Sequence, residues 1–384
     1  MNTLTELTLD VQSNLMCPPD PAQGPRIVFF SGGTALNDIA PVLAGMTENA
    51  TYLVTPFDNG GSSQKLRKAL SMPAVGDLRS RLVALAGGAA SSPLATALAY
   101  RLPKGASRLE LQRDLIELHT GRHPVMSALG VEHRGFLLTH LRHTINALPK
   151  WFDYRHASIG NLVITGGYLL HGRQFDPVVT ELSKRLGIRG QVALSAVDTL
   201  QLAVDLADGS QIVGQDRLTG KEHPPIAASV SRIYLHDTIG PREAHLMDAT
   251  RAHIAAADVI CYPPGSFYSS VLANLLPKGT GQAIANSSAK KIYCPSLGHD
   301  PECIGLSLRD QVSALLGVLR ADAGPEVAVA DLLSAVVVDL RVPEQDCAQI
   351  ESEFGVACLR RRLGQDGSDR YDATRFSQVL MTLV

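Results

Sequence analysis

Two glycine-containing segments near the start of the chain carry residue types that bind phosphate. The apolar run Ile27–Phe30 leads into Ser31-Gly32-Gly33-Thr34, and a second apolar run leads into Asp58-Asn59-Gly60-Gly61-Ser62-Ser63. Glycine lets the backbone turn sharply and approach a phosphate, and the free N–H groups of a following helix face the anion. The spacing therefore predicts two phosphate loops, each at the carboxyl end of a strand.

Charged side chains near these loops could act on a bound phosphate. Asp58 is a candidate Mg²⁺ ligand, because hard cations take carboxylate and phosphate oxygens together. It could equally cap the helix expected to begin near Ser62. In Gly76-Asp77-Leu78-Arg79, the carboxylate and the guanidinium could both face the ligand, or they could pair with each other.

Two further motifs suit the same kind of ligand. Asn161 follows Gly160, and its amide could bind a base or sugar edge, or it could cap a helix. Gly265-Ser266 precedes an apolar segment of helical character and is a second candidate anion site. An ordinary turn with Ser266 as the N-cap is the alternative there.

The elements expected around these residues alternate between strands and helices. Strands are predicted over 27–30, 52–55, 231–235, 258–262, 291–294 and 336–338, and a hairpin turns at Asp208-Gly209. Helical patterns dominate from 65 to about 174 and recur over 241–256 and 308–319. The order predicts a Rossmann-like, doubly wound α/β fold, with a mostly parallel sheet, a large helical insertion and a small β-hairpin element.

The same pattern suggests a division of the chain. We expect a flexible leader over 1–25, an α/β nucleotide-binding domain over 26–320 with its helical insertion at about 80–157, and a C-terminal α/β extension over 321–384 packed on that domain.

Composition excludes several classes of protein. A net charge of −2 and an aromatic content of 5% argue against nucleic acid as a partner. No apolar run approaches the roughly 20 residues that cross a bilayer, so no membrane partner is expected. The six cysteines are scattered without a C-x-x-C pair, which suits a reduced, cytoplasmic protein.

Taken in order, the motifs resemble those of the CofD-like superfamily, named for 2-phospho-L-lactate transferase, and most closely its gluconeogenesis-factor (YvcK-type) branch. The resemblance covers roughly residues 26–320. It implies a nucleotide or a nucleotide-sugar of the UDP-sugar type as ligand, with Mg²⁺ as a possible cofactor. The ligand-binding residues it implies are Gly32, Gly33, Thr34, Asn59, Gly60, Gly61, Ser62, Ser63, Arg67, Gly76, Arg79, Asn161, Gly265 and Ser266.

The chain departs from the branch at four of its motif positions. Ser31 and Ala35 stand where the branch usually has glycine, and Gln64 replaces the last glycine of G-G-S-S-G. Asn59 replaces the second aspartate of an Asp-Asp pair, so a carboxylate that could help to hold a metal is missing. The ligand could therefore differ from that of a typical member.

Two functions remain open at this stage. The first is a ligand-binding metabolic or cell-envelope regulator. The second is a Mg²⁺-dependent transferase of a phosphate-linked group, with Asp58 and Asp77 as its catalytic residues. We also expect a homodimer or larger assembly, because family members tend to self-associate and the helical block contains apolar residues such as Leu137, Leu138, Leu141 and Ile145.

Overall fold

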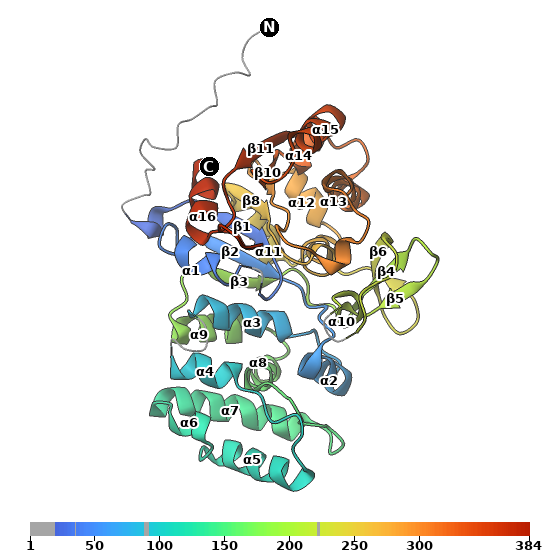
Figure 1. The fold of residues 1–384 in the computed structure, drawn as a ribbon. Coiled ribbons are helices and arrows are strands. Elements are labelled where there is room, and N and C mark those ends of the chain that lie inside the picture. The colour runs from blue at the N-terminus through green and yellow to red at the C-terminus, as the bar shows by residue number, and fades with distance from the viewer. Residues whose placement is uncertain (1–19, 35, 88–91, 221–222) are drawn as a thin grey trace.

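A seven-stranded parallel sheet forms the centre of the molecule in the computed structural model, which describes residues 20–34, 36–87, 92–220 and 223–384 (Figure 1). Every neighbouring pair of strands in this sheet is parallel. The strand order is β11 (Ala357–Arg361), β10 (Ala335–Asp339), β9 (Lys290–Tyr293), β8 (Val259–Tyr262), β1 (Ile27–Phe30), β2 (Ala50–Val54) and β3 (Gln191–Leu194). The order reverses between β1 and β8, so the fold is the expected doubly wound α/β type.

The inner strands are buried on both faces, as their continuous apolar sequences require. Alternate side chains point to opposite faces. Phe29 stacks on Tyr52 at 5.3 Å between ring centroids, on the face covered by α1 (Ile39–Leu43) and α16 (Ala373–Thr382). Phe30 packs against Tyr262 on the other face, in the largest apolar cluster of the described residues.

A block of helices connects β2 to β3 and has an apolar core of its own. It contains α2 (Gly61–Leu70), α3 (Gly76–Leu85), α4 (Pro93–Ala99), α5 (Arg108–Thr120), α6 (Pro124–Ser127), α7 (Val131–Ala147), α8 (Ile159–Leu170) and α9 (Asp176–Leu186). Leu137 and Leu141 of α7 are fully buried inside this block, so these two side chains offer no surface to a second copy. Self-association stays a prediction.

A separate antiparallel sheet has the order β5 (Gln211–Val213), β4 (Gln201–Leu206), β6 (Val230–His236) and β7 (Pro241–Arg242). The predicted Asp208-Gly209 hairpin joins β4 to β5, with Gly209 at a φ of 85° that favours glycine. The helix predicted from Pro241 is wrong. Pro241 lies in β7 opposite His236, at a sheet edge where the missing N–H of proline is tolerated, and α11 (Asp248–Ala256) begins only later.

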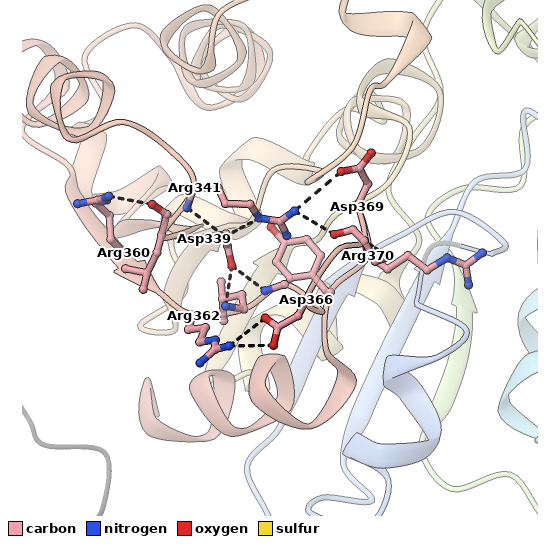
Figure 2. Close-up of polar contacts among 12 residues, drawn as sticks. Asp339, Arg341, Arg360, Arg362, Asp366, Asp369 and Arg370 are labelled. Carbon is pink, nitrogen blue, oxygen red and sulfur yellow. Dashed lines mark hydrogen bonds and ion pairs between the residues drawn. The ribbon is translucent and has the colours of Figure 1, made fainter.

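The second half of the parallel sheet is covered by α12 (Thr280–Ala285), α13 (Leu308–Ala323), α14 (Val329–Leu332) and α15 (Glu344–Phe354). After β8, the expected apolar helix forms as a π-helical turn over Phe267–Val271 that continues as a 3-10 turn over Leu272–Leu275. At the carboxyl end of β10, Asp339 is enclosed by hydrogen-bond donors from the segment that follows β11 and from Arg341 (Figure 2).

Candidate functional site

A pocket of about 250 Å³ lies beyond the carboxyl end of β2, between the starts of α2, α3 and α8. We call it the β2 pocket. It brings together three motifs that the sequence separates by up to a hundred residues. Its lining residues are Asp58, Gly60, Gly61, Ser62, Gly76, Asp77, Arg79, Ser80, Arg101, His156 and Asn161.

A chain of hydrogen bonds fixes one wall of the β2 pocket. Oγ of Ser62 accepts from the backbone N–H of Ser158 at 3.1 Å and from Nδ2 of Asn161 at 3.0 Å. Oδ1 of Asn161 in turn accepts from Nε of Arg79 at 3.3 Å. The helix cap of α8 is Ser158, not Asn161, so the amide of Asn161 serves to orient Arg79.

Two carboxylates, those of Asp58 and Asp77, line the pocket. Oδ1 of Asp58 accepts from the backbone N–H of Gly60 at 2.9 Å, which closes the turn before α2. Oδ2 of Asp77, in the first turn of α3, accepts from Oγ1 of Thr55 at 3.3 Å. Burial and then the charge of Asp77 raise the pKa of Asp58 to about 7, although the Gly60 N–H and Arg67 oppose the shift.

Two guanidinium groups complete the pocket. Burial, and then repulsion from Arg101, lower the pKa of Arg79 to about 10, so the Arg79 guanidinium remains charged at neutral pH. Nη1 of Arg101 donates to the backbone oxygen of His156 at 3.4 Å. The pocket thus carries paired positive groups for phosphate oxygens and paired carboxylates for a cation, a combination that suits a phosphate ligand with bound Mg²⁺.

No group of three His, Cys, Asp or Glu side chains that could hold a metal ion exists in the described residues. A Mg²⁺ ion could therefore bind here only with one or two carboxylates and with oxygens from phosphate or water, which is how Mg²⁺ commonly binds. Asp58 and Asp77 fit that role, because both carboxylates line the pocket and because burial, together with the charge of Asp77, raises the pKa of Asp58, a cost that a bound cation would reduce.

The first glycine loop lies behind the pocket and does not line it. A Cβ atom on Gly33 would lie 2.7 Å from Oδ1 of Asp77, and one on Gly32 would lie 2.3 Å from Oγ of Ser270. Nη2 of the buried Arg81 donates to the backbone oxygen of Gly32 at 2.6 Å. Thr34 is exposed, and the first described residues beyond it, 36–38, form a turn before the short helix α1 begins at Ile39.

Three residues expected to touch the ligand instead support the pocket from outside. Arg67 donates to the backbone oxygen of Leu200 at 2.5 Å and to Oδ1 of Asn59 at 3.2 Å. Nδ2 of Asn59 donates to Oε1 of Gln201 at 3.0 Å, which ties the loop to β4. Oγ of Ser63 accepts from the N–H groups of Val75 and Gly76 at the start of α3.

The candidate anion site at Gly265-Ser266 is already filled by the protein's own carboxylates. The backbone N–H of Phe267 donates to Asp300 at 2.8 Å, and those of Tyr268 and Ser269 donate to Glu302 at 3.0 and 2.8 Å. Burial raises the pKa of Glu302 to about 7, with a further contribution from Asp300. The N–H groups of these three residues are therefore paired within the protein, and Ser266 makes no side-chain cap. Gly265 lines a separate pocket of about 190 Å³, and ligand binding at Gly265 and Ser266 stays a prediction.

Three residues that line the β2 pocket were not predicted from the sequence: Ser80, Arg101 and His156. Ser80 directly follows the Gly-Asp-x-Arg motif, and His156 precedes Ser158 by two residues, so widening each motif would have found them. Arg101 carries no motif signal. It reaches the pocket because its backbone pairs with Ser158 at the start of α8.

Comparisons with known proteins identify the family of this chain. Residues 27–364 match the family model of the 2-phospho-L-lactate transferase CofD. A protein of Halalkalibacterium halodurans named gluconeogenesis factor is 28% identical over 76% of this chain and 73% of its own length. The gluconeogenesis factor of Bacillus subtilis is 29% identical over 76% of this chain and 74% of its own length.

Among solved structures, a member of the UPF0052 family from Bacillus halodurans superposes with a TM-score of 0.64. It is 23% identical and covers 93% of this chain and 99% of its own, so it supports the fold alone. Within the described residues, no helix combines the length and the apolar character needed to cross a membrane. Because the family model spans most of the sequence, the chain belongs to the CofD family, in the branch whose curated relatives are named gluconeogenesis factors.

Proposed function

We propose that this protein binds a nucleotide or a nucleotide-sugar of the UDP-sugar type in the β2 pocket, as a cytoplasmic metabolic or cell-envelope regulator. The observation that carries the proposal is the convergence of Arg79 and Arg101 on a pocket that Asp58 and Asp77 also line. Guanidinium groups suit the oxygens of a diphosphate, and the glycine backbones at Gly60 and Gly61 leave room for it. The name of the curated relatives supports a role in regulation.

Binding is tested by native mass spectrometry of the purified protein, followed by calorimetry with UDP and UDP-glucose. We expect a retained nucleotide or a measurable affinity for one of these probes. Arg79→Leu should weaken that affinity at least about tenfold, because it removes a charge-assisted hydrogen bond. Arg189→Leu, which changes an arginine paired with Glu48 outside the pocket, is the matched control and should bind as the wild type does.

A Mg²⁺-dependent transferase is the second candidate, and the pair Asp58 and Asp77 favours it. Asn59 does not remove a ligand from this site, because its side chain points to Arg67 and Gln201 and Asp77 supplies the second carboxylate. When bound there, Mg²⁺ would neutralise charge on phosphate oxygens during group transfer. Arg79 and Arg101 would hold the remaining phosphate oxygens.

The two candidates differ in turnover. For a regulator, Asp77→Asn should reduce the dependence of ligand affinity on Mg²⁺, with no product formed by the wild type. Chromatography of nucleotide-linked donors incubated with Mg²⁺ would detect a released nucleoside mono- or diphosphate. Mg²⁺-dependent product that is lost in Asp77→Asn would replace the regulator with the transferase.

A further inference from the structure

Helix α5 carries apolar side chains on two opposite faces. Leu111 and Leu118 are buried in the core of the helical block. Leu109 and Ile116 lie on the other side, seven residues apart and therefore two turns along one face. Figure 1 shows α5 at the end of the block that lies furthest from the parallel sheet. Leu109 is 76% exposed and Ile116 is 57% exposed, so no described element covers this outer face.

An open groove of about 650 Å³ follows the outer face of the helix, and we call it the α5 groove. Leu109 and Ile116 line it together with Pro124 at the start of α6. Single exposed apolar residues are ordinary on a protein surface, but a row of them along a hollow is typical of an interaction site. The α5 groove shares no lining residue with the β2 pocket, so the two sites are separate.

The helix that forms this groove is well defined at both ends. At its start, the N–H of Ser107 donates to the carboxylate of Glu110 at 2.8 Å, and the N–H of Glu110 donates to Oγ of Ser107 at 3.3 Å. At its end, Gly121 takes the left-handed conformation with a φ of 75°. A preformed helix loses little conformational entropy on binding, so its outer face needs no rearrangement to receive a partner.

The charges beside the groove have both signs, which favours a second copy of this chain as the partner. Arg113 and Arg122 line the groove with Glu117, and Glu110 lies one turn before Arg113. In the described part of the chain, Arg113, Arg122 and Glu117 form no ion pair. Two copies can therefore pair opposite charges across the groove. An anionic membrane or a strongly acidic protein would instead meet the two glutamates.

We propose that two copies of this chain associate through α5, with Leu109 and Ile116 of one copy packed against those of the other about a two-fold axis. A two-fold pair uses the same surface twice, so one such groove on each chain is sufficient. The inference does not depend on the proposed function. It locates self-association on the outer face of the helical block, whereas Leu137 and Leu141 lie inside that block.

The length of α5 limits the strength of this dimer. Its thirteen residues form a helix about 20 Å long. One pair of such helices lies at the small end of specific interfaces, which bury about 800 Å² on each partner. We therefore expect a dissociation constant in the micromolar range, and a dimer that dissociates on dilution.

Sedimentation velocity over about 1 to 200 μM measures this equilibrium. The mass should rise from that of one 41.0 kDa chain toward twice that value. Ile116→Lys places an ammonium group in the apolar contact twice in each dimer and should raise the dissociation constant at least about tenfold. Val131→Lys is the matched control, because Val131 is an equally exposed apolar residue at the start of α7 and outside the groove. It should keep the wild-type constant.

A cross-link tests the same contact without adding a charge. Gln112 lines the groove between Leu109 and Ile116. At the middle of a self-paired face, a residue meets its own counterpart whether the two helices run parallel or antiparallel. Gln112→Cys should therefore form a disulfide between copies under mild oxidation, which requires two Cα atoms within about 7 Å. Val131→Cys and the wild type, with its six native cysteines, give the background.

Three results would overturn the inference. The first is a single-chain mass up to the highest concentration. The second is a dimer whose dissociation constant is unchanged in both Ile116→Lys and Leu109→Lys, or equally weakened in Val131→Lys, since the interface would then lie elsewhere. The third is a cross-link in Gln112→Cys no stronger than the background. Thermal unfolding of each variant shows that it folds, and a failure of nucleotide binding would leave the dimer unaffected.

Discussion

Asp58 and Asp339 occupy comparable places in the parallel sheet and have opposite electrostatics. Each lies at or just beyond the carboxyl end of an inner strand, β2 for Asp58 and β10 for Asp339. Asp339 accepts hydrogen bonds from the backbone N–H groups of Arg341, Leu363 and Gly364 and from Nε of Arg341. Asp58 has the Gly60 N–H as a donor and Asp77 as a neighbouring negative charge.

The pKa values follow from these surroundings. Burial would raise the pKa of Asp339, but the bonds from Arg341 and from the backbone outweigh it and lower the value to about 2. At Asp58 burial and a like charge act together, and the pKa rises to about 7. A carboxylate that accepts several hydrogen bonds stabilises the fold, whereas one with a single printed donor and a neighbouring like charge, at a pocket, is suited to bind a cation or a proton.

The largest effect is expected from Asp339→Ala. The variant leaves the buried N–H groups of Leu363 and Gly364 without acceptors and should lower the free energy of unfolding by roughly 2–4 kcal/mol. Denaturant unfolding at pH 7 measures the change. Asp369→Ala removes an exposed carboxylate 3.9 Å from the same Arg341 and should leave the midpoint unchanged. An equal loss of unfolding free energy in both variants would show that the hydrogen bonds of Asp339 contribute no more than the exposed carboxylate of Asp369.

The pH dependence sharpens the same contrast. Because the folded pKa of Asp339 lies below its unfolded value of about 4, its stabilisation is complete above pH 4 and is lost as the pH falls toward 2. The difference in unfolding free energy between wild type and Asp339→Ala should narrow over that window. A difference that does not depend on pH would mean that the carboxylate charge contributes nothing.

A smaller effect of opposite sign is expected from Asp58→Asn. The raised pKa of Asp58 means that ionisation destabilises the fold as the pH rises from about 4 through 7. The amide removes that penalty and should raise the free energy of unfolding by about 1–2 kcal/mol at pH 8, with no gain at pH 4. A destabilised variant at pH 8 would contradict the conclusion that ionisation of Asp58 costs the fold free energy.

The smallest effect is expected from Arg362→Ala, which removes an exposed ion pair with Asp366 at 2.9 Å (Figure 2). Solvent screens both partners, and holding two long side chains in place costs entropy. The melting temperature should match that of the wild type in low and high salt. A melting temperature that falls in low salt but not in high salt would show that the arginines near β11 stabilise the fold as a network of ion pairs and not only through Asp339.

Much of the fold can be predicted from local sequence, and the strands that were not predicted have physical features that explain why. The apolar runs of β1 and β8 identify inner strands because parallel sheets are buried on both faces. The edge strands β3 and β11 escaped the sequence interpretation. β11 ends in two arginines and is only partly buried, so it lacks the apolar pattern that marks a strand.

The candidate site shows the same limit. Asp58, Asp77, Arg79 and Asn161 could be selected because each stands in a short motif, and the structure brings them to one pocket. The surroundings of Ser266 could not be predicted from the sequence. Glu302, which accepts from the N–H of Ser269, lies more than thirty residues further along the chain, and no local sequence pattern pairs the two segments.

The internal carboxylates at the Phe267–Val271 turn have a consequence for stoichiometry. A doubly wound sheet offers anion sites in both of its halves, yet here Asp300 and Glu302 permanently occupy the donors of the second half. Free phosphate in the surroundings cannot compete for those donors unless it displaces a covalently tethered acceptor. The molecule should therefore take up one diphosphate per chain, with a single class of sites across a full titration.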